Sequence, residues 1–164
     1  TLFRSAALPS EIAIVVFMQA DGSENPAEAV RLLAPIGDGR ADLVLGSRVM
    51  GEAQLGSLLP HQRFGNWLAT RLIRLIWGWR YTDLGPFRAI RREALTRLAM
   101  RDRNYGWTVE MQVRAVKHGL RIVEVPVSYG LRQAGTNKVS GNWRASFQAG
   151  CKILTVIGRE LLSR

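Results

Sequence analysis

Apolar runs that alternate with amphipathic segments constrain the fold of this chain more than any other feature of its sequence. Residues 12–18 (IAIVVFM) form an unbroken apolar run, which is typical of a strand covered on both faces in a parallel sheet. Residues 41–48 (ADLVLGSR) predict a second buried strand, stopped by Gly46. Between the two, Asn25-Pro26 is a helix-start signal, and the helix is expected to end near Gly37.

The rest of the chain continues the alternation, so the sequence predicts an α/β layered fold. Pro126 favours an edge position for the last strand. We expect a mobile loop over 49–60, a helix over 61–79, a strand over 87–91, a helix over 92–100, a helix over 105–119, a strand over 121–129, a basic loop over 132–142 and an amphipathic C-terminal helix over 142–164.

The charge of the chain is unevenly distributed. Residues 1–60 hold four Arg or Lys and seven Asp or Glu, a net charge of −3, whereas residues 61–164 hold nineteen and six, a net charge of +13. A basic half suggests an anionic partner, which could be a nucleic acid, a phosphorylated ligand or an anionic membrane. No recognised DNA- or RNA-binding motif is present, so no nucleic-acid partner is expected.

Two polar turns follow the two predicted strands. Asp21 places a carboxylate after the first strand, and Gly46-Ser47-Arg48 places a guanidinium after the second. Ligands of open α/β sheets bind outside the carboxyl ends of the strands. The pair would suit a phosphate held through Mg²⁺ or Mn²⁺, although an Asp-Gly pair is more often only a turn.

Seven motifs in order, from the strand ending in Gln19-Ala20-Asp21 to the final R-x-x-G-x-x-K, resemble the family 2 glycosyltransferases of the GT-A fold. The branch resembled is that of the dolichyl- or polyprenyl-phosphate sugar transferases. The resemblance implies a three-layer αβα nucleotide-diphospho-sugar transferase fold, incomplete at its N-terminus. Residues 1–164 would then form a single partial domain, with 1–11 a disordered or artefactual lead.

The resemblance also assigns roles to residues near the donor. The D-x-D segment of the family falls on residues 19–21, so Asp21 is expected to bind the metal, Mg²⁺ or Mn²⁺. Gln19 stands in place of the usual Asp and would contact the substrate. Arg132 and Lys138 match the cations over the diphosphate, and Asn137 stands where serine is common.

Further matches lie nearer the acceptor. Arg48 and Arg63 match arginines expected near the phosphates or the acceptor, and Asp83 of the TDLGP turn matches an acid of the family and is expected to be catalytic, as Asp21 is. Glu110 matches an acidic position whose role is either catalytic or the orientation of a nearby arginine. A lipid-phosphate acceptor is already ionised and needs no general base.

The Trp-rich helix over 61–79 leaves two interpretations open. The favoured one is a core-packing face, and the other is a helix at the membrane surface. The apolar stripe consists of Phe64, Trp67, Leu68, Leu72, Leu75, Ile76 and Trp79. The same two interpretations, a core-packing face or a membrane-surface helix, apply to the C-terminal helix. Its expected apolar stripe consists of Trp143, Phe147, Cys151, Leu154, Ile157 and Leu161.

The resemblance therefore implies a metal-dependent inverting enzyme of cell envelope biogenesis. It would move a sugar from a nucleotide-sugar donor to a polyprenyl phosphate, as a cytoplasmic protein peripheral to the inner face of the membrane. The alternative is a non-catalytic basic module derived from the same fold, which binds a membrane surface.

Overall fold

The computed structural model of the chain describes residues 9, 11–54, 56–102, 104, 106–131 and 143–163. Most of the expected N-terminal lead and the whole basic loop over 132–142 lie outside these residues. The elements in chain order are β1 (Ile14–Phe17), the 3-10 turn η2 (Pro26–Glu28), α1 (Ala29–Gly37), β2 (Leu43–Ser47), α2 (Pro60–Trp77), β3 (Arg88–Arg91), α3 (Arg92–Leu98), α4 (Trp107–Lys117), β4 (Ile122–Pro126) and α5 (Trp143–Leu162).

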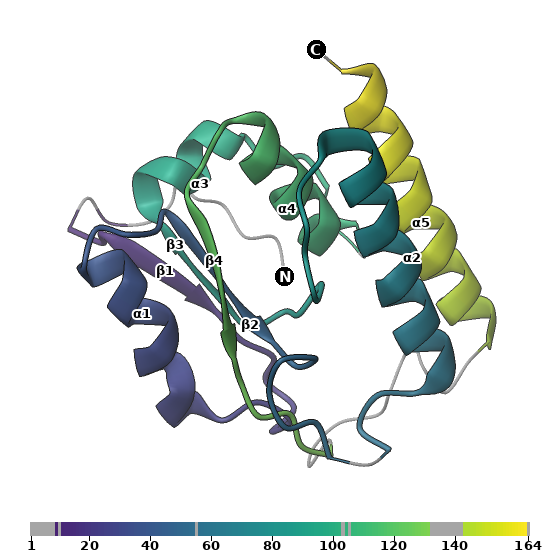
Figure 1. Cartoon of the computed structure of the whole chain (residues 1–164), viewed down its shortest axis with the longest axis horizontal. Coiled ribbons are helices and arrows are strands. Elements are labelled where there is room, and N and C mark those ends of the chain that lie inside the picture. The colour runs from purple at the N-terminus through teal and green to yellow at the C-terminus, as the bar shows by residue number, and fades with distance from the viewer. Residues whose placement is uncertain are drawn as a thin grey trace.

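The four strands form one mixed sheet in the order β1-β3-β2-β4 (Figure 1). Strands β2 and β4 pair in parallel, and β3 pairs antiparallel with both β1 and β2. The expectation that residues 12–18 form a strand of a parallel sheet, covered on both faces, is wrong. Strand β1 pairs antiparallel with β3 at an edge of the described sheet, and Val16 is 38% exposed. Hydrophobicity identified this strand but carries no information about its partner.

Helices cover both faces of the sheet (Figure 1). The side chains of β2 pack against helices on each face. Successive side chains of a strand point to opposite faces. Leu43 and Leu45 pack in the larger cluster with residues of α2, α4 and α5, whereas Val44 packs in a second cluster with Leu32 and Ile36 of α1. The predicted three-layer αβα arrangement is confirmed.

Helix α2 confirms only part of the expected core-packing stripe, since Leu72 and Ile76 pack against the larger cluster. Ala69 and Ile73 are buried, but Phe64, Trp67 and Leu75 are 60%, 55% and 82% exposed. The favoured core-packing interpretation is wrong for these three side chains. The helix contacts α4 and α5, with Ala69 and Ile73 in the core cluster beside Leu72 and Ile76, and leaves Phe64 and Trp67 on the surface.

Helix α5 also differs in its buried face. Val156 and Ile157 are buried, whereas Cys151, Leu154 and Leu161 are exposed. The expected side chains of Trp143 and Phe147 lie outside the described ones. Among the described residues, no helix is both long and apolar enough to cross a bilayer.

Candidate active site

The turn after β1 holds the carboxylate of Asp21 at the end of the strand. Asp21 is buried, and its Oδ1 accepts the backbone N–H of Ser23 at 3.0 Å and also the Ser23 hydroxyl. Gly22 lies between them at a φ of +77°, a conformation that glycine adopts without strain. The local sequence therefore fixes the position of Asp21 through a side-chain turn.

Gln19 connects this turn to the end of β4. Its Oε1 accepts the Tyr129 hydroxyl at 3.3 Å and the Ser23 hydroxyl at 3.4 Å. The backbone N–H of Gly130 also donates to the Ser23 carbonyl oxygen at 2.8 Å. These hydrogen bonds join the turn after β1 to the segment after β4, beyond the carboxyl ends of the two strands.

Glu24 is a second buried carboxylate in the same turn. Its Oε2 accepts the backbone N–H of Gln19 at 2.7 Å. Its Oε1 is buried and has no hydrogen-bond partner in the described structure. Burial raises the pKa of Glu24 to about 7, and the neighbouring charge of Asp21 acts in the same direction, whereas the Gln19 hydrogen bond and Arg48 oppose the rise.

Arg48 and Asp83 form a bidentate ion pair beside this turn. The Nε and Nη2 atoms of Arg48 donate to the two oxygens of Asp83 at 2.7 and 2.8 Å, and the Arg48 backbone N–H donates to Oδ2 at 2.9 Å. Burial disfavours the cation, but the hydrogen-bonded Asp83 outweighs it and raises the pKa of Arg48. The guanidinium also lies 5.0 Å from the centre of the Tyr129 ring. Asp83 thus fixes both the charge and the direction of Arg48.

Three other elements hold the turn that carries Asp83. Glu124 of β4 accepts the backbone N–H of Thr82 at 3.0 Å and its hydroxyl at 2.9 Å. Asn66 of α2 accepts the backbone N–H of Leu84 at 2.7 Å, and Gln112 of α4 donates to the Asp83 carbonyl oxygen at 2.9 Å. The turn is therefore fixed by the sheet and by two helices.

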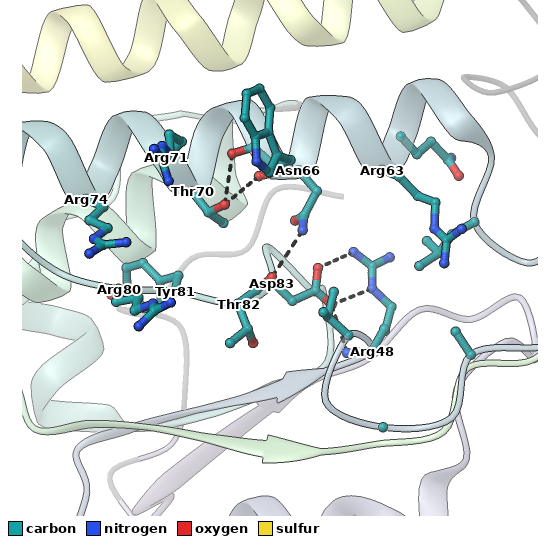
Figure 2. A pocket seen from close by; sticks show the side chains of 16 residues that line it. Arg48, Arg63, Asn66, Thr70, Arg71, Arg74, Arg80, Tyr81, Thr82 and Asp83 are labelled. Carbon is teal, nitrogen blue, oxygen red and sulfur yellow. Dashed lines mark hydrogen bonds and ion pairs between the residues drawn. The ribbon is translucent and has the colours of Figure 1, made fainter.

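A cavity of about 590 Å³ opens beside this turn (Figure 2). Figure 2 shows arginine side chains of α2 on one side and the Arg48–Asp83 pair on the other. Among the described residues of the lining, Asp83 is the one acid, and it is already paired with Arg48. The described wall is therefore strongly cationic, with five arginines: Arg48, Arg63, Arg71, Arg74 and Arg80. Such a wall suits phosphate groups.

The structure brings together some of the residues predicted from the sequence. Arg48, Arg63 and Asp83 line the cavity. Asp21 and Gln19 are not among its lining residues and lie in the turn after β1, whose Glu24 is close enough to Arg48 for the two charges to interact. The other predicted donor residues, Arg132, Asn137 and Lys138, lie outside the described residues.

Glu110 lies away from the cavity lining, between α4 and α5. It is fully buried, and its carboxylate accepts the backbone N–H groups of Arg101 at 3.1 Å and Asp102 at 2.7 Å. It also pairs with Arg159 at 2.7 Å and Arg114 at 3.4 Å. Of the two roles considered, the orientation of arginines has direct contacts in the structure.

Four residues of the site are absent from the sequence-based predictions. Asn66, Gln112 and Glu124 act through contacts with a turn that lies 16 to 42 residues away in the chain, which no local pattern reveals. Glu24 carried a detectable signal, because it is an acid three positions after Asp21 in the same turn.

Comparison with curated proteins identifies glycosyltransferases as relatives of the chain. No family model matches the sequence. An uncharacterised glycosyltransferase of Mycobacterium tuberculosis is 38% identical over 144 residues, which cover 83% of this chain and 61% of the relative. An undecaprenyl-phosphate mannosyltransferase of Micrococcus luteus is 33% identical, covering 78% and 54%. A polyprenol monophosphomannose synthase of Mycolicibacterium smegmatis is 32% identical, covering 79% and 50%.

Solved structures establish the fold. Glucosyl-3-phosphoglycerate synthase from Mycobacterium tuberculosis, in complex with Mn²⁺, UDP-glucose and phosphoglyceric acid, superposes with a TM-score of 0.60 at 21% identity. The match covers 91% of this chain and 51% of that chain. The same enzyme with phosphoglyceric acid alone gives a TM-score of 0.61 at 20% identity.

The fold of the chain is thus part of the GT-A glycosyltransferase fold, as the resemblance implied. The chain is a homologue of named glycosyltransferases, among them polyprenyl-phosphate mannosyltransferases. It spans 50–61% of the length of these curated relatives.

Proposed function

We propose that the protein is a metal-dependent, inverting glycosyltransferase that moves a sugar from a nucleotide-sugar donor to a polyprenyl phosphate. The observation that carries the proposal is the arginine-lined cavity, to which Arg48 contributes directly after the carboxyl end of β2, where ligands of α/β folds bind. The printed names of two relatives, an undecaprenyl-phosphate mannosyltransferase and a polyprenol monophosphomannose synthase, support this acceptor class.

The cavity suits an acceptor phosphate because its cations are available. Arg63, Arg71, Arg74 and Arg80 are exposed, and no acidic side chain in the described part of the chain pairs with them. A phosphate monoester carries close to two negative charges at neutral pH, since its second pKa is about 6. We infer that the phosphate enters between Arg48 and α2, where Asp83 acts as the positioning residue for Arg48.

The proposed reaction is a single displacement at the anomeric carbon. An oxygen of the acceptor phosphate forms the new bond to that carbon from one face, while the bond to the donor diphosphate breaks on the other. The nucleoside diphosphate leaves with the bonding electron pair, so the configuration inverts. The nucleophile is already ionised, so no side chain needs to remove a proton. Arg132 and Lys138 are proposed to stabilise the charge on the leaving diphosphate.

The turn after β1 fits a divalent cation. Asp21 and Glu24 supply hard carboxylate oxygens, and one oxygen of Glu24 is buried without a hydrogen-bond partner in the described structure. Mg²⁺ and Mn²⁺ favour such oxygens and complete their coordination with phosphates and water. Asp21 would hold the ion, which when bound neutralises charge on the donor diphosphate. A solved structure of the same fold contains Mn²⁺ together with UDP-glucose.

The exposed side of α2 is proposed to contact the membrane surface that carries the acceptor. Phe64, Trp67 and Leu75 are exposed on the helix that also carries Arg63, Arg71 and Arg74. Aromatic residues and arginines together are typical of helices that lie at a lipid interface. A peripheral position at the inner face of the membrane follows from this proposal.

Replacing Arg63 by alanine tests the acceptor site. Loss of one exposed phosphate contact should raise the KM for polyprenyl phosphate about tenfold, since hydrogen bonds to charged groups contribute roughly 1.5–3 kcal/mol. The KM for the nucleotide sugar should stay within about twofold, because the donor is held elsewhere. Steady-state kinetics of the full-length protein in detergent measure both constants.

Arg97→Ala is the matched control for this prediction. Arg97 is exposed on α3 and does not line the cavity, so its loss removes the same charge without touching the site. Equal acceptor KM values for the wild type and Arg63→Ala would contradict the proposed acceptor site.

A non-catalytic membrane-surface module is the alternative function. Gln19 in the position of an expected metal-binding Asp and the exposed aromatic residues of α2 favour it. Titration of the full-length protein with a nucleotide sugar, with and without Mn²⁺, distinguishes the two. A transferase gains donor affinity from the metal, whereas a lipid-binding module does not.

A further inference from the structure

Glu24 holds an unusual position for a carboxylate. The side chain is only 5% exposed, and Oε2 is held by the Gln19 backbone N–H at 2.7 Å. Oε1 is equally inaccessible, yet no donor in the described residues contacts it. A buried polar atom without a partner costs about 1–3 kcal/mol, so native structures rarely keep one without a reason.

The neighbouring groups do not supply that missing partner. Arg48 is close enough to act on the charge of Glu24, but its Nε and Nη2 atoms are committed to Asp83 at 2.7 and 2.8 Å. Asp21, which also acts on Glu24, carries a charge of the same sign. Two carboxylates close together in a buried turn repel one another, and a bound cation relieves that repulsion.

The side-chain oxygen of Gln19 has hydrogen-bond partners within the protein. Its Oε1 accepts hydrogen bonds from Ser23 and Tyr129, which join the turn to the end of β4. An amide oxygen is also a weaker ligand for a divalent cation than a carboxylate is. Gln19 therefore has a structural role, so a second carboxylate ligand would come from another residue.

We propose that Glu24 is the second protein carboxylate of a divalent-cation site formed with Asp21, and that Gln19 holds the turn instead of binding the ion. The inference rests on the proposed function, which assigns Asp21 to the metal. Mg²⁺ is usually bound by one or two carboxylates together with phosphates and water. The described residues contain no group of three or more His, Cys, Asp or Glu that could hold a metal, so the proposed site has no third such ligand among them.

A competing explanation assigns Glu24 to charge balance. Arg88 is fully buried and donates to carbonyl oxygens, such as that of Thr108 at 3.1 Å. Burial lowers the pKa of Arg88 to about 10, and the charge of Glu24 acts against that shift. On this explanation Glu24 stabilises the fold and does not bind a metal. Glu24→Asp separates the two accounts, because it keeps the charge but withdraws the oxygens by one methylene group.

Titration of the full-length protein with Mn²⁺ alone, followed by the electron paramagnetic resonance signal of free Mn²⁺, tests the inference. Glu24→Gln and Glu24→Asp should each weaken Mn²⁺ binding about tenfold or more, and Asp21→Asn at least as much. Glu93→Gln is the matched control, since Glu93 is exposed on α3 and should leave binding unchanged. Circular dichroism and thermal unfolding verify that each variant is folded.

The outcomes separate this inference from the proposed function. Mn²⁺ binding that Asp21→Asn weakens and both Glu24 variants leave unchanged would overturn the role of Glu24 and leave the proposed function intact. Loss of stability in Glu24→Gln with wild-type Mn²⁺ affinity in Glu24→Asp would support charge balance and overturn the inference. Absence of Mn²⁺ binding by the wild type would also overturn the role of Glu24 as a metal ligand. The sugar-transfer assay tests the proposed function independently.

Discussion

Replacing Asp21 by asparagine is expected to lower sugar transfer by the full-length protein about a thousandfold, equivalent to roughly 4 kcal/mol of transition-state stabilisation. The carboxylate lies at the end of β1 and is proposed to hold the cation that neutralises the donor diphosphate. The asparagine side-chain oxygen can still accept the Ser23 backbone N–H, so the turn should persist. The measurement is kcat/KM for the nucleotide sugar at saturating Mn²⁺.

The control for Asp21→Asn is its thermal unfolding curve, which should lie close to that of the wild type. Ser23→Ala is a useful companion, because it removes one of the hydrogen bonds to Asp21 and keeps the carboxylate. Its activity should fall far less than that of Asp21→Asn. Wild-type transfer by folded Asp21→Asn would show that the metal is not held by Asp21.

Replacing Glu110 by alanine is expected to destabilise the fold by roughly 3–5 kcal/mol, because it leaves two backbone N–H groups without their acceptor and removes a buried partner of Arg114. Its carboxylate accepts hydrogen bonds from the backbone N–H groups of Arg101 and Asp102 and forms ion pairs with Arg159 and Arg114. For a domain of this size each kcal/mol corresponds to about 2–4 °C, so Tm should fall by roughly 10 °C. Differential scanning calorimetry measures the shift.

Glu110→Gln decides between the structural and the catalytic role. A structural Glu110 predicts that the glutamine variant loses part of the stability but keeps its kcat when assayed well below its Tm. A catalytic Glu110 predicts the opposite pattern, with normal stability and a kcat that falls by orders of magnitude. Glu93→Ala, an exposed acid of α3, should change neither quantity.

Local patterns predicted the elements of this fold well, and pairing between distant segments poorly. The continuous apolar run over 12–18 predicts a strand there, and the apolar run within 41–48 predicts β2 in the same way. The antiparallel pairing of Ile14 with Arg91 joins residues 77 positions apart. Such pairing is decided by the packing of the whole sheet, which a hydrophobicity pattern does not encode.

The buried faces of the helices show a related limit. The periodicity of α2 identified a helix, but apolar residues occur on more than one stripe, and the core takes Ala69 and Ile73 while Phe64 and Leu75 remain exposed. A small residue such as Ala69 allows close helix contact although it contributes little to a hydrophobic pattern. Which stripe is buried depends on α4 and α5, and not on α2 alone.

For the candidate site, the residues at the strand ends were predictable from the sequence. The residues whose hydrogen bonds fix their positions were not. Arg48 and Asp83 were assigned to phosphate binding and to catalysis, but their mutual ion pair joins segments 35 positions apart and appears only in the folded chain. Glu124 was missed for the same reason. The three predicted residues of the basic loop remain predictions, since they lie outside the described residues.

The most direct test of the central proposal is sugar transfer by the full-length protein. A panel of radiolabelled nucleotide sugars is incubated with polyprenyl phosphate, in parallel with Mn²⁺ and with EDTA, and the lipid-linked product is extracted and counted. The proposal predicts product from one nucleotide sugar, loss of that product with EDTA, and its recovery when Mn²⁺ is restored. Lipid-linked product that EDTA leaves undiminished, or no product from any donor in the panel, would contradict it.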